Sequence, residues 1–171
     1  VTVSAYGLRE GVIAGDDDVE PNAALFDSIR LYLKTSPTEK LFSTALYRFV
    51  KPIGNVKNIG ERLLKAACMM ADIGAHMHPD HRPDLVFEQV LRAPLPMISH
   101  AQRVFLALAL ATRYTSGFSL PAGCGKVLSS SEQRKAVILG RALRLGGVYS
   151  GRAGNILERA SLTIKSSRLT L

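Results

Sequence analysis

Four short segments of this chain carry the same signal for the start of an α-helix. In each, a short polar side chain is followed three positions later by Glu or Gln, at Ser36–Glu39, Asn58–Glu61, Ser99–Gln102 and Ser129–Glu132. Such a pair of side chains accepts hydrogen bonds from backbone amides that the first helical turn leaves free. Four signals of one kind in one chain predict a mainly α fold.

The periodicity of the apolar residues predicts about six helices, most of which begin close to these signals. The expected ranges are 21–34, 37–51, 58–76, 83–92, 99–115 and 130–149. Prolines separate the helices, and Pro52 should end the second. The fifth helix is apolar nearly all round, so we expect it at the centre of a helical bundle. The glycines of 116–125 predict a plain connection, and Gly146, Gly147 and Gly151 predict a helix end and a turn.

Both ends of the chain show the period of two that is typical of β-strands. Apolar residues alternate within 1–5, and again within 162–171 around a turn at Ser166 and Ser167. A first residue other than Met, with a strand pattern at each end, favours a fragment of a longer protein, although proteolysis or trimmed disordered ends would give the same sequence. We expect three regions: the end of a preceding domain and a linker at 1–18, a helical domain at 19–160, and the start of a truncated β segment at 161–171.

The net charge of +8 is concentrated in the later part of the chain. Residues 117–171 hold nine Lys or Arg and only two Asp or Glu. A basic surface favours polyanionic partners such as phosphorylated molecules, although it also serves solubility alone. No apolar run approaches the roughly 18 residues that span a membrane, and the N-terminus does not resemble a signal peptide. With Cys68 and Cys124 expected as reduced thiols, the sequence predicts a cytoplasmic protein without membrane contact.

A cluster of His and Asp side chains lies at the end of the predicted helix 58–76. In metal-dependent HD phosphohydrolases, an adjacent His-Asp pair on a helix binds a metal that activates water. Here Ala71 precedes Asp72, so the pair is broken, and we predict a degenerate HD site without a metal. Its residues are Asp72, His76, His78 and His81. The histidines and Asp80 would also suit a different transition-metal site, but Pro79 interrupts their spacing and favours surface hydrogen bonding.

Five arginines on the last two predicted helices have a spacing that favours phosphate binding. They are Arg103, Arg113, Arg134, Arg141 and Arg144. Within each helix they fall on one face, and the planar guanidinium group matches phosphate oxygens bidentately. Salt bridges within and between helices are the alternative interpretation, but the scarcity of acidic residues in this part of the chain favours anion binding.

The sequence does not favour other kinds of site. The segment SGFSLPAGCG at 116–125 lacks the Lys-Ser/Thr pair of a phosphate-binding loop, and no G-x-S-x-G motif presents a nucleophile. The chain has no Trp and only 6% aromatic residues, so it lacks the rings on which single-stranded nucleic acid stacks. A nucleic-acid partner is therefore not expected.

Several segments, in order along the whole chain, resemble the exopolyphosphatase/guanosine-pentaphosphatase family. Val3–Ile13, which contains the motif LREG, is similar to the segment that closes the family's actin-like domain. Leu63–Gly74 resembles its HD-like helix, and Leu139–Gly151 resembles a later LG-x-x-LRL…SG stretch. The segments HPDHR at 78–82 and ISHAQR at 98–103 are similar to the alpha-proteobacterial branch of the family.

The resemblance implies an HD-like helical domain of a larger enzyme. Members of this family use Mg²⁺ to remove terminal phosphates from inorganic polyphosphate, or the 5′-phosphate of guanosine pentaphosphate. Their catalytic residues lie in actin-like domains that would precede Val1, so we expect no catalytic residue and no cofactor in this chain. Its implied roles are to line a channel for polyphosphate and to form a homodimer. Two alternatives remain open: an independent HD-type metal phosphohydrolase, and a non-enzymatic basic helical module that binds nucleic acid or a protein.

Overall fold

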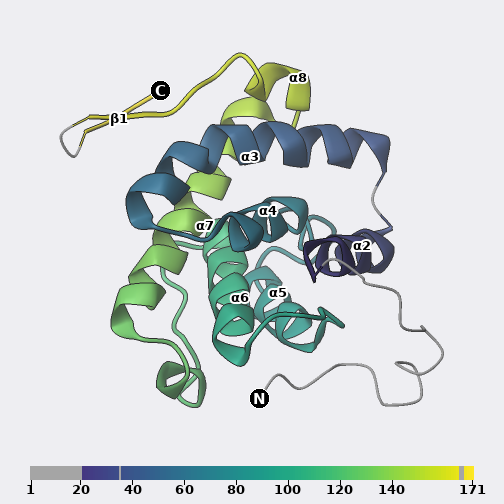
Figure 1. Ribbon diagram of the computed structural model, residues 1–171, viewed down its shortest axis with the longest axis vertical. Helices are drawn as coiled ribbons and strands as arrows, with labels where there is room; N and C mark the ends of the chain where they lie inside the picture. The colour runs from purple at the N-terminus through teal and green to yellow at the C-terminus, as the bar shows by residue number, and fades with distance from the viewer. Residues whose placement is uncertain (1–20, 35, 166–167) are drawn as a thin grey trace.

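The chain folds into a bundle of helices with a small β-hairpin near its C-terminal end (Figure 1). The computed structural model describes residues 21–34, 36–165 and 168–171. Its longer helices are α2 (Pro21–Leu33), α3 (Pro37–Lys57), α4 (Glu61–Met69), α5 (Arg82–Arg92), α6 (His100–Tyr114) and α7 (Ser130–Ser150). The shorter elements are the 3-10 helix η1 (Cys124–Lys126), α8 (Gly154–Leu157), β1 (Thr163–Lys165) and β2 (Arg168–Thr170). The predicted mainly α bundle of about six helices is confirmed.

Three of the four predicted helix starts are present as capping boxes. The Ser36 amide donates to Glu39 Oε2 at 2.7 Å, and the Glu39 amide donates to Ser36 Oγ at 3.3 Å. The boxes at Ser99–Gln102 and Ser129–Glu132 have the same reciprocal bonds. The prediction at Asn58 was wrong, because Asn58 has φ 52° and ends α3 in a left-handed conformation. Helix α4 begins after Gly60 without a side-chain cap.

Two predicted helix ends differ from the structure by several residues. Helix α3 continues through Pro52 to Lys57, since Ile53 and Gly54 are buried in the core and hold this last part in place. Helix α4 ends at Met69, and hydrogen-bonded turns follow where helix was predicted as far as residue 76.

Helix α7 ends within one residue of the predicted range 130–149, and it runs through the glycine pair at 146–147. It ends at Gly151, whose φ of 58° is the left-handed conformation that glycine adopts without strain. The pair is needed within the helix because a Cβ at Gly146 would lie 2.6 Å from Cδ1 of Leu46. Close packing within the helix therefore explains the glycine at position 146, which the sequence pattern assigned to a helix end.

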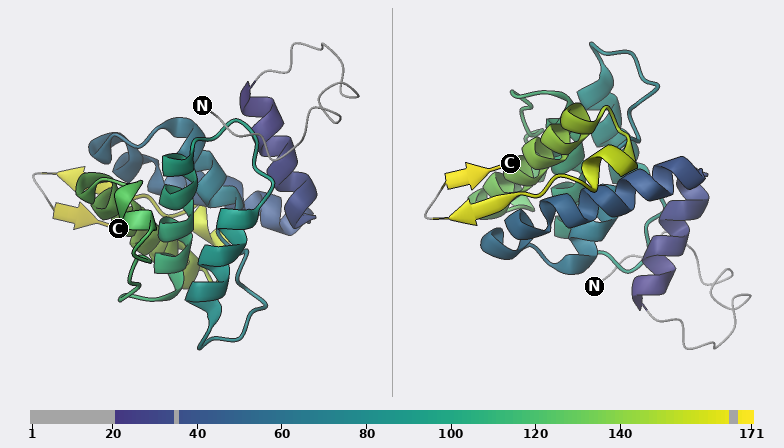
Figure 2. Two further views of the ribbon diagram at one scale, coloured as in Figure 1. Left: turned by 90° about the horizontal axis from the view of Figure 1, so that it is seen from below. Right: turned by 90° about the horizontal axis from the view of Figure 1, so that it is seen from above.

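Helix α6 is the centre of the bundle, as predicted. Every residue from Val104 to Arg113 is buried, and α6 lies between α5 and α7. The backbones of α6 and α7 approach very closely at Gly140, where an added Cβ would lie 2.2 Å from the carbonyl oxygen of Ala109. Helix α3 crosses one end of this layer, and the views from below and above show α2 packed at its side (Figure 2).

The predicted strand pattern at 162–171 corresponds to an antiparallel hairpin. Thr163 pairs with Thr170 and Ile164 pairs with Leu169, and the hairpin projects from the helical body (Figure 1). The predicted strand pattern within 1–5 and the turn at Ser166 and Ser167 lie outside the described residues. Within the part of the chain that the structure describes, no helix is long and apolar enough to cross a membrane.

Candidate functional site

A polar site surrounds Asp72, where the turn after α4 meets the start of α3. Two neighbouring cavities, of about 280 Å³ and 140 Å³, are both lined by Glu39, Phe42, Asp72 and His76. Asp72 and His76, two of the four residues predicted for a degenerate HD site, therefore line the same two cavities. The preceding residue, Ala71, is buried.

The carboxylate of Asp72 is occupied by a buried arginine from the central helix. Nη2 of Arg113 donates a hydrogen bond to Oδ1 of Asp72, and Nη1 of Arg113 donates to the carbonyl oxygen of Leu143 at 2.6 Å. Only 6% of the Arg113 side chain and 19% of the Asp72 side chain are exposed. Arg152 Nε adds a second positive charge 3.9 Å from Oδ2 of Asp72. Guanidinium groups thus neutralise the carboxylate that would otherwise be available to a cation.

The surroundings of Arg113 hold its guanidinium in this position. The group lies 5.9 Å from the ring centroid of Phe42 and 5.7 Å from that of Tyr114. A Cβ at Gly147 would lie 2.9 Å from Nη2, so glycine on α7 leaves the room that the guanidinium needs. Nε of Arg113 is buried without a hydrogen-bond partner among the described residues. Arg113 thereby joins α6 to α7 and to the turn that carries Asp72.

Tyr114, the next residue, fixes the conformation of that turn. Its hydroxyl donates to the carbonyl oxygen of Ala71 at 2.9 Å and accepts from the amide of Gly74 at 3.3 Å. Burial raises the pKa of Tyr114, so the hydroxyl keeps its proton for the bond to Ala71. The apolar residues of 70–76 continue the helical period in the sequence, but these two hydrogen bonds hold the segment in turns.

The second carboxylate of the site, Glu39, belongs to the cap of α3. The backbone and hydroxyl of Ser36 hold the pKa of Glu39 below its ordinary value, and His76 and Arg152 contribute more weakly. One carboxylate is thus bonded to a cap and the other to a guanidinium. Among residues 21–34, 36–165 and 168–171, no three His, Cys, Asp or Glu side chains are grouped so that they would hold a metal.

The other two predicted histidines lie apart from this site. His78 and His81 are exposed, their ring centroids are 5.9 Å apart, and neither lines the two cavities around Asp72. Nδ1 of His78 lies 3.8 Å from Asp80. The structure therefore brings together Asp72 and His76 of the four predicted residues.

The five predicted arginines divide into two groups. Arg103 donates to the carbonyl oxygens of Ala93 and Leu95, at 2.5 Å and 2.8 Å, and burial lowers its pKa. Arg113 is bonded internally as described above, so both arginines of α6 support the fold. The other three lie exposed along α7, and none of them contacts an acceptor within the described part of the chain: Arg134, Arg141 and Arg144.

The sequence analysis missed two residues of the Asp72 site, Glu39 and Arg152. In the sequence, Glu39 is recognisable only as part of a helix cap. No sequence pattern distinguishes Arg152, which follows a predicted turn. Their distance from Asp72 along the chain leaves no local motif, so the fold alone brings them together.

These features define a mainly helical domain whose central carboxylate is paired with arginine. A comparison with protein-family models identifies the domain more closely, since the model described as the C-terminal region of exopolyphosphatase matches residues 49–168. The match covers more than half of the chain, which therefore belongs to this exopolyphosphatase C-terminal family. A search of curated proteins gives no match.

Proposed function

We propose that this chain holds inorganic polyphosphate for an exopolyphosphatase, and that the exposed arginines of α7 make the contacts. The single observation that carries this proposal is an unbalanced charge along α7. Both acidic residues of 117–171 are engaged elsewhere: Glu132 accepts hydrogen bonds from Ser129, and Glu158 pairs with Arg48 at 3.4 Å. The three exposed arginines of α7 therefore have no ion-pair partner in the described part of the chain, and Glu132 at the start of the helix is the one negative charge on α7.

The spacing of these arginines suits a polymer better than a single phosphate. Arg134 and Arg144 are ten residues apart on one helix, which corresponds to roughly 15 Å along its axis. One phosphate group does not reach from Arg134 to Arg144, whereas an extended polyanion can lie along all three arginines. Binding of this kind should weaken steeply with salt, because each contact releases counterions.

The proposal includes the parent enzyme. Hydrolysis, Mg²⁺ and the catalytic residues are proposed to belong to other parts of that protein, since both carboxylates of the described site are engaged, Asp72 by Arg113 and Glu39 by the Ser36 amide. The choice between polyphosphate and guanosine pentaphosphate, the alpha-proteobacterial branch and the cytoplasmic location stay predictions.

A homodimer is the second part of the proposal. Val148 and Tyr149 at the end of α7 are 74% and 49% exposed, and Ile156 on α8 is 47% exposed. Apolar side chains that gather at one end of a basic helix favour contact with another protein surface. A second copy would extend the row of arginines and thus the length of polymer held.

The test is to measure binding of fluorescently labelled polyphosphate to the 171-residue chain. The variant Arg134→Gln/Arg141→Gln/Arg144→Gln should lower the affinity at least tenfold and reduce the slope of log affinity against log salt by about 2, at roughly 0.7 per lost contact. The matched control, Arg48→Gln/Lys57→Gln/Arg92→Gln, removes the same charge from other exposed positions and should change the affinity by less than about twofold.

Equal losses in the two triple variants would refute binding along α7. Equally tight binding of DNA with the same charge would favour a general basic module. Release of phosphate from polyphosphate by the chain alone, with Mg²⁺, would favour the independent phosphohydrolase.

A further inference from the structure

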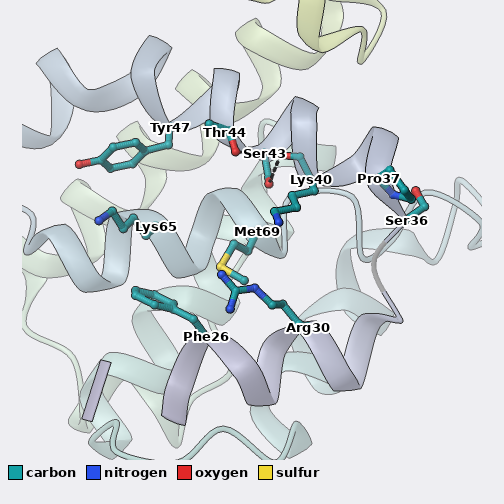
Figure 3. Close-up of a pocket in the computed structure, with 10 residues that line it drawn as sticks. All are labelled: Phe26, Arg30, Ser36, Pro37, Lys40, Ser43, Thr44, Tyr47, Lys65 and Met69. Atoms are coloured by element: carbon teal, nitrogen blue, oxygen red, sulfur yellow. Dashed lines mark hydrogen bonds between the residues drawn. The ribbon is translucent and has the colours of Figure 1, made fainter. Parts of the chain in front are cut away.

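A second, larger pocket lies between α2, α3 and α4. Its volume is about 610 Å³, within the range of cavities that bind small molecules. Figure 3 shows Phe26 and Arg30 on α2 facing Lys40 and Tyr47 on α3, with the side chains of α4 between them. Eight of the ten residues that line the pocket precede residue 49, where the match to the exopolyphosphatase family begins. Most of the pocket therefore lies outside the matched region, and Lys65 and Met69 lie within it.

The pocket attracts anions. Each of the three helices contributes one cation, namely Arg30, Lys40 and Lys65, and no carboxylate is among the lining residues. Arg30 and Lys65 each have one acidic partner on their own helix, at Asp27 and Glu61. Both of these pairs are exposed, and exposed pairs contribute little, so the two cations remain available to a ligand. No acceptor for the Lys40 ammonium group occurs in the part of the chain that the structure describes.

The same pocket has an apolar side that a bare phosphate would leave uncovered. Phe26 and Met69 pack against the core and line the pocket, and the ring of Tyr47 lies opposite them (Figure 3). Aromatic and thioether groups provide a surface on which a flat heterocycle stacks. The lining thus combines phosphate recognition with recognition of an aromatic ring.

The hydroxyl groups of the pocket are arranged to accept hydrogen bonds. Ser43 Oγ and Thr44 Oγ1 both donate to the carbonyl oxygen of Lys40, at 3.0 Å and 2.8 Å. The Tyr47 hydroxyl donates to Glu61 at 2.9 Å, and burial together with this bond raises the pKa of Tyr47 to about 12. With their protons used, Ser43 and Thr44 offer lone pairs, which suit the hydroxyl or N–H groups of a ligand.

We propose that this pocket binds a nucleoside phosphate. The phosphate lies between Arg30 and Lys40, which point toward each other near Met69 (Figure 3), the base stacks on Phe26 and Met69, and the sugar hydroxyls donate to Ser43 and Thr44. The proposal is independent of polyphosphate binding by α7, because none of the α7 arginines lines this pocket.

Calorimetric titration of the 171-residue chain with AMP, adenosine and pyrophosphate tests the proposal. AMP should bind at least about tenfold more tightly than either adenosine or pyrophosphate, since only AMP uses both sides of the pocket. Lys40→Gln should weaken AMP binding about tenfold, which is the usual loss for one hydrogen bond to a charged group. The matched control is Lys57→Gln, which removes the same charge from another exposed position of α3 and should leave AMP binding unchanged.

A second variant examines the apolar side. Phe26→Leu keeps an apolar residue against the core, and it should weaken AMP binding at least fivefold while leaving pyrophosphate binding unchanged, because stacking is lost. Three results would overturn the proposal: absence of AMP binding at millimolar concentration, equal losses in Lys40→Gln and Lys57→Gln, or pyrophosphate binding as tight as that of AMP. None of these results bears on the α7 arginines, whose triple variant should bind AMP as the unaltered chain does.

Discussion

Replacing Arg113 with Leu should destabilise the fold more than any other single change at the Asp72 site. The substitution keeps an apolar side chain between α6 and α7 but removes the guanidinium that bonds Asp72 and the Leu143 carbonyl. Asp72 is only 19% exposed, so its carboxylate would be left largely buried and without its main partner. A buried ion pair adds little net stability as a pair, but an unpaired buried charge is very unfavourable.

The expected magnitude follows from this burial. Removing one partner of a buried pair costs about 3–5 kcal/mol, and the partial exposure of Asp72 favours the lower end of that range. A loss of about 3 kcal/mol should lower the Tm by roughly 6–12 °C in a chain of this size. Asp72→Asn keeps an acceptor for Arg113 but leaves its buried guanidinium without a countercharge, so it should cost about 2–3 kcal/mol.

Urea denaturation followed by circular dichroism measures both effects, with the slope against urea as a check that the unfolding transition is unchanged. In the double variant Asp72→Asn/Arg113→Leu no buried charge remains, so its cost should be at least about 1 kcal/mol less than the sum of the single costs. The reasoning would be refuted if Arg113→Leu cost under about 1 kcal/mol, or if the two changes were additive.

Two further outcomes are expected. Gly140→Ala should destabilise the fold by about 2 kcal/mol or more, because the added Cβ meets the backbone where α6 contacts α7. At Gly123 an added Cβ faces open space, so Gly123→Ala should change the stability by less than about 0.5 kcal/mol. Similar losses of stability for the two variants in thermal denaturation would contradict the close approach of α6 and α7. Acidification should also destabilise the fold, because the pKa values of Glu39 and Glu132 are held below 4.5 by their capping bonds to Ser36 and Ser129. Lowered pKa values in the folded state mean that this stabilisation is present above about pH 4.5 and is lost as the pH falls through them. In Glu39→Gln/Glu132→Gln the urea midpoint should therefore depend less on pH below 4.5, and an unchanged dependence would contradict the role of these bonds.

Local patterns predicted the helix starts well, because a capping box involves only four consecutive residues. The boxes at Ser36, Ser99 and Ser129 needed no tertiary information. Asn58 has the same spacing to Glu61, but asparagine also tolerates the left-handed conformation that ends a helix, and here it ends α3. Helix ends were harder to predict, since burial beyond Pro52 outweighs the hydrogen bond that proline cannot make.

The Asp72 site could be predicted only in part, because some of its contacts depend on how distant helices pack. The sequence singles out Asp72 and His76, and the structure places both beside the same two cavities. The partner of Asp72 is not visible in the sequence, because Arg113 lies 41 residues further along the chain and reaches Asp72 only through the packing of α6. The pocket between α2, α3 and α4 could not be predicted from a local pattern either, since its three cations come from three helices.

The structure changes how the positive charge of this chain should be interpreted. Arginines were counted in the sequence as candidates for one function, but Arg103 and Arg113 donate to backbone carbonyls inside the fold. A guanidinium that is 6% exposed does not reach a polymer in solution, so its charge does not measure affinity for phosphate. The ion pair at Asp72 neutralises the carboxylate, and Arg113 joins α6 to α7 and to the turn after α4. Stability and polyphosphate binding should therefore respond to different arginines: variants of Arg113 should lower the Tm, and variants of Arg141 should lower only the affinity for the polymer.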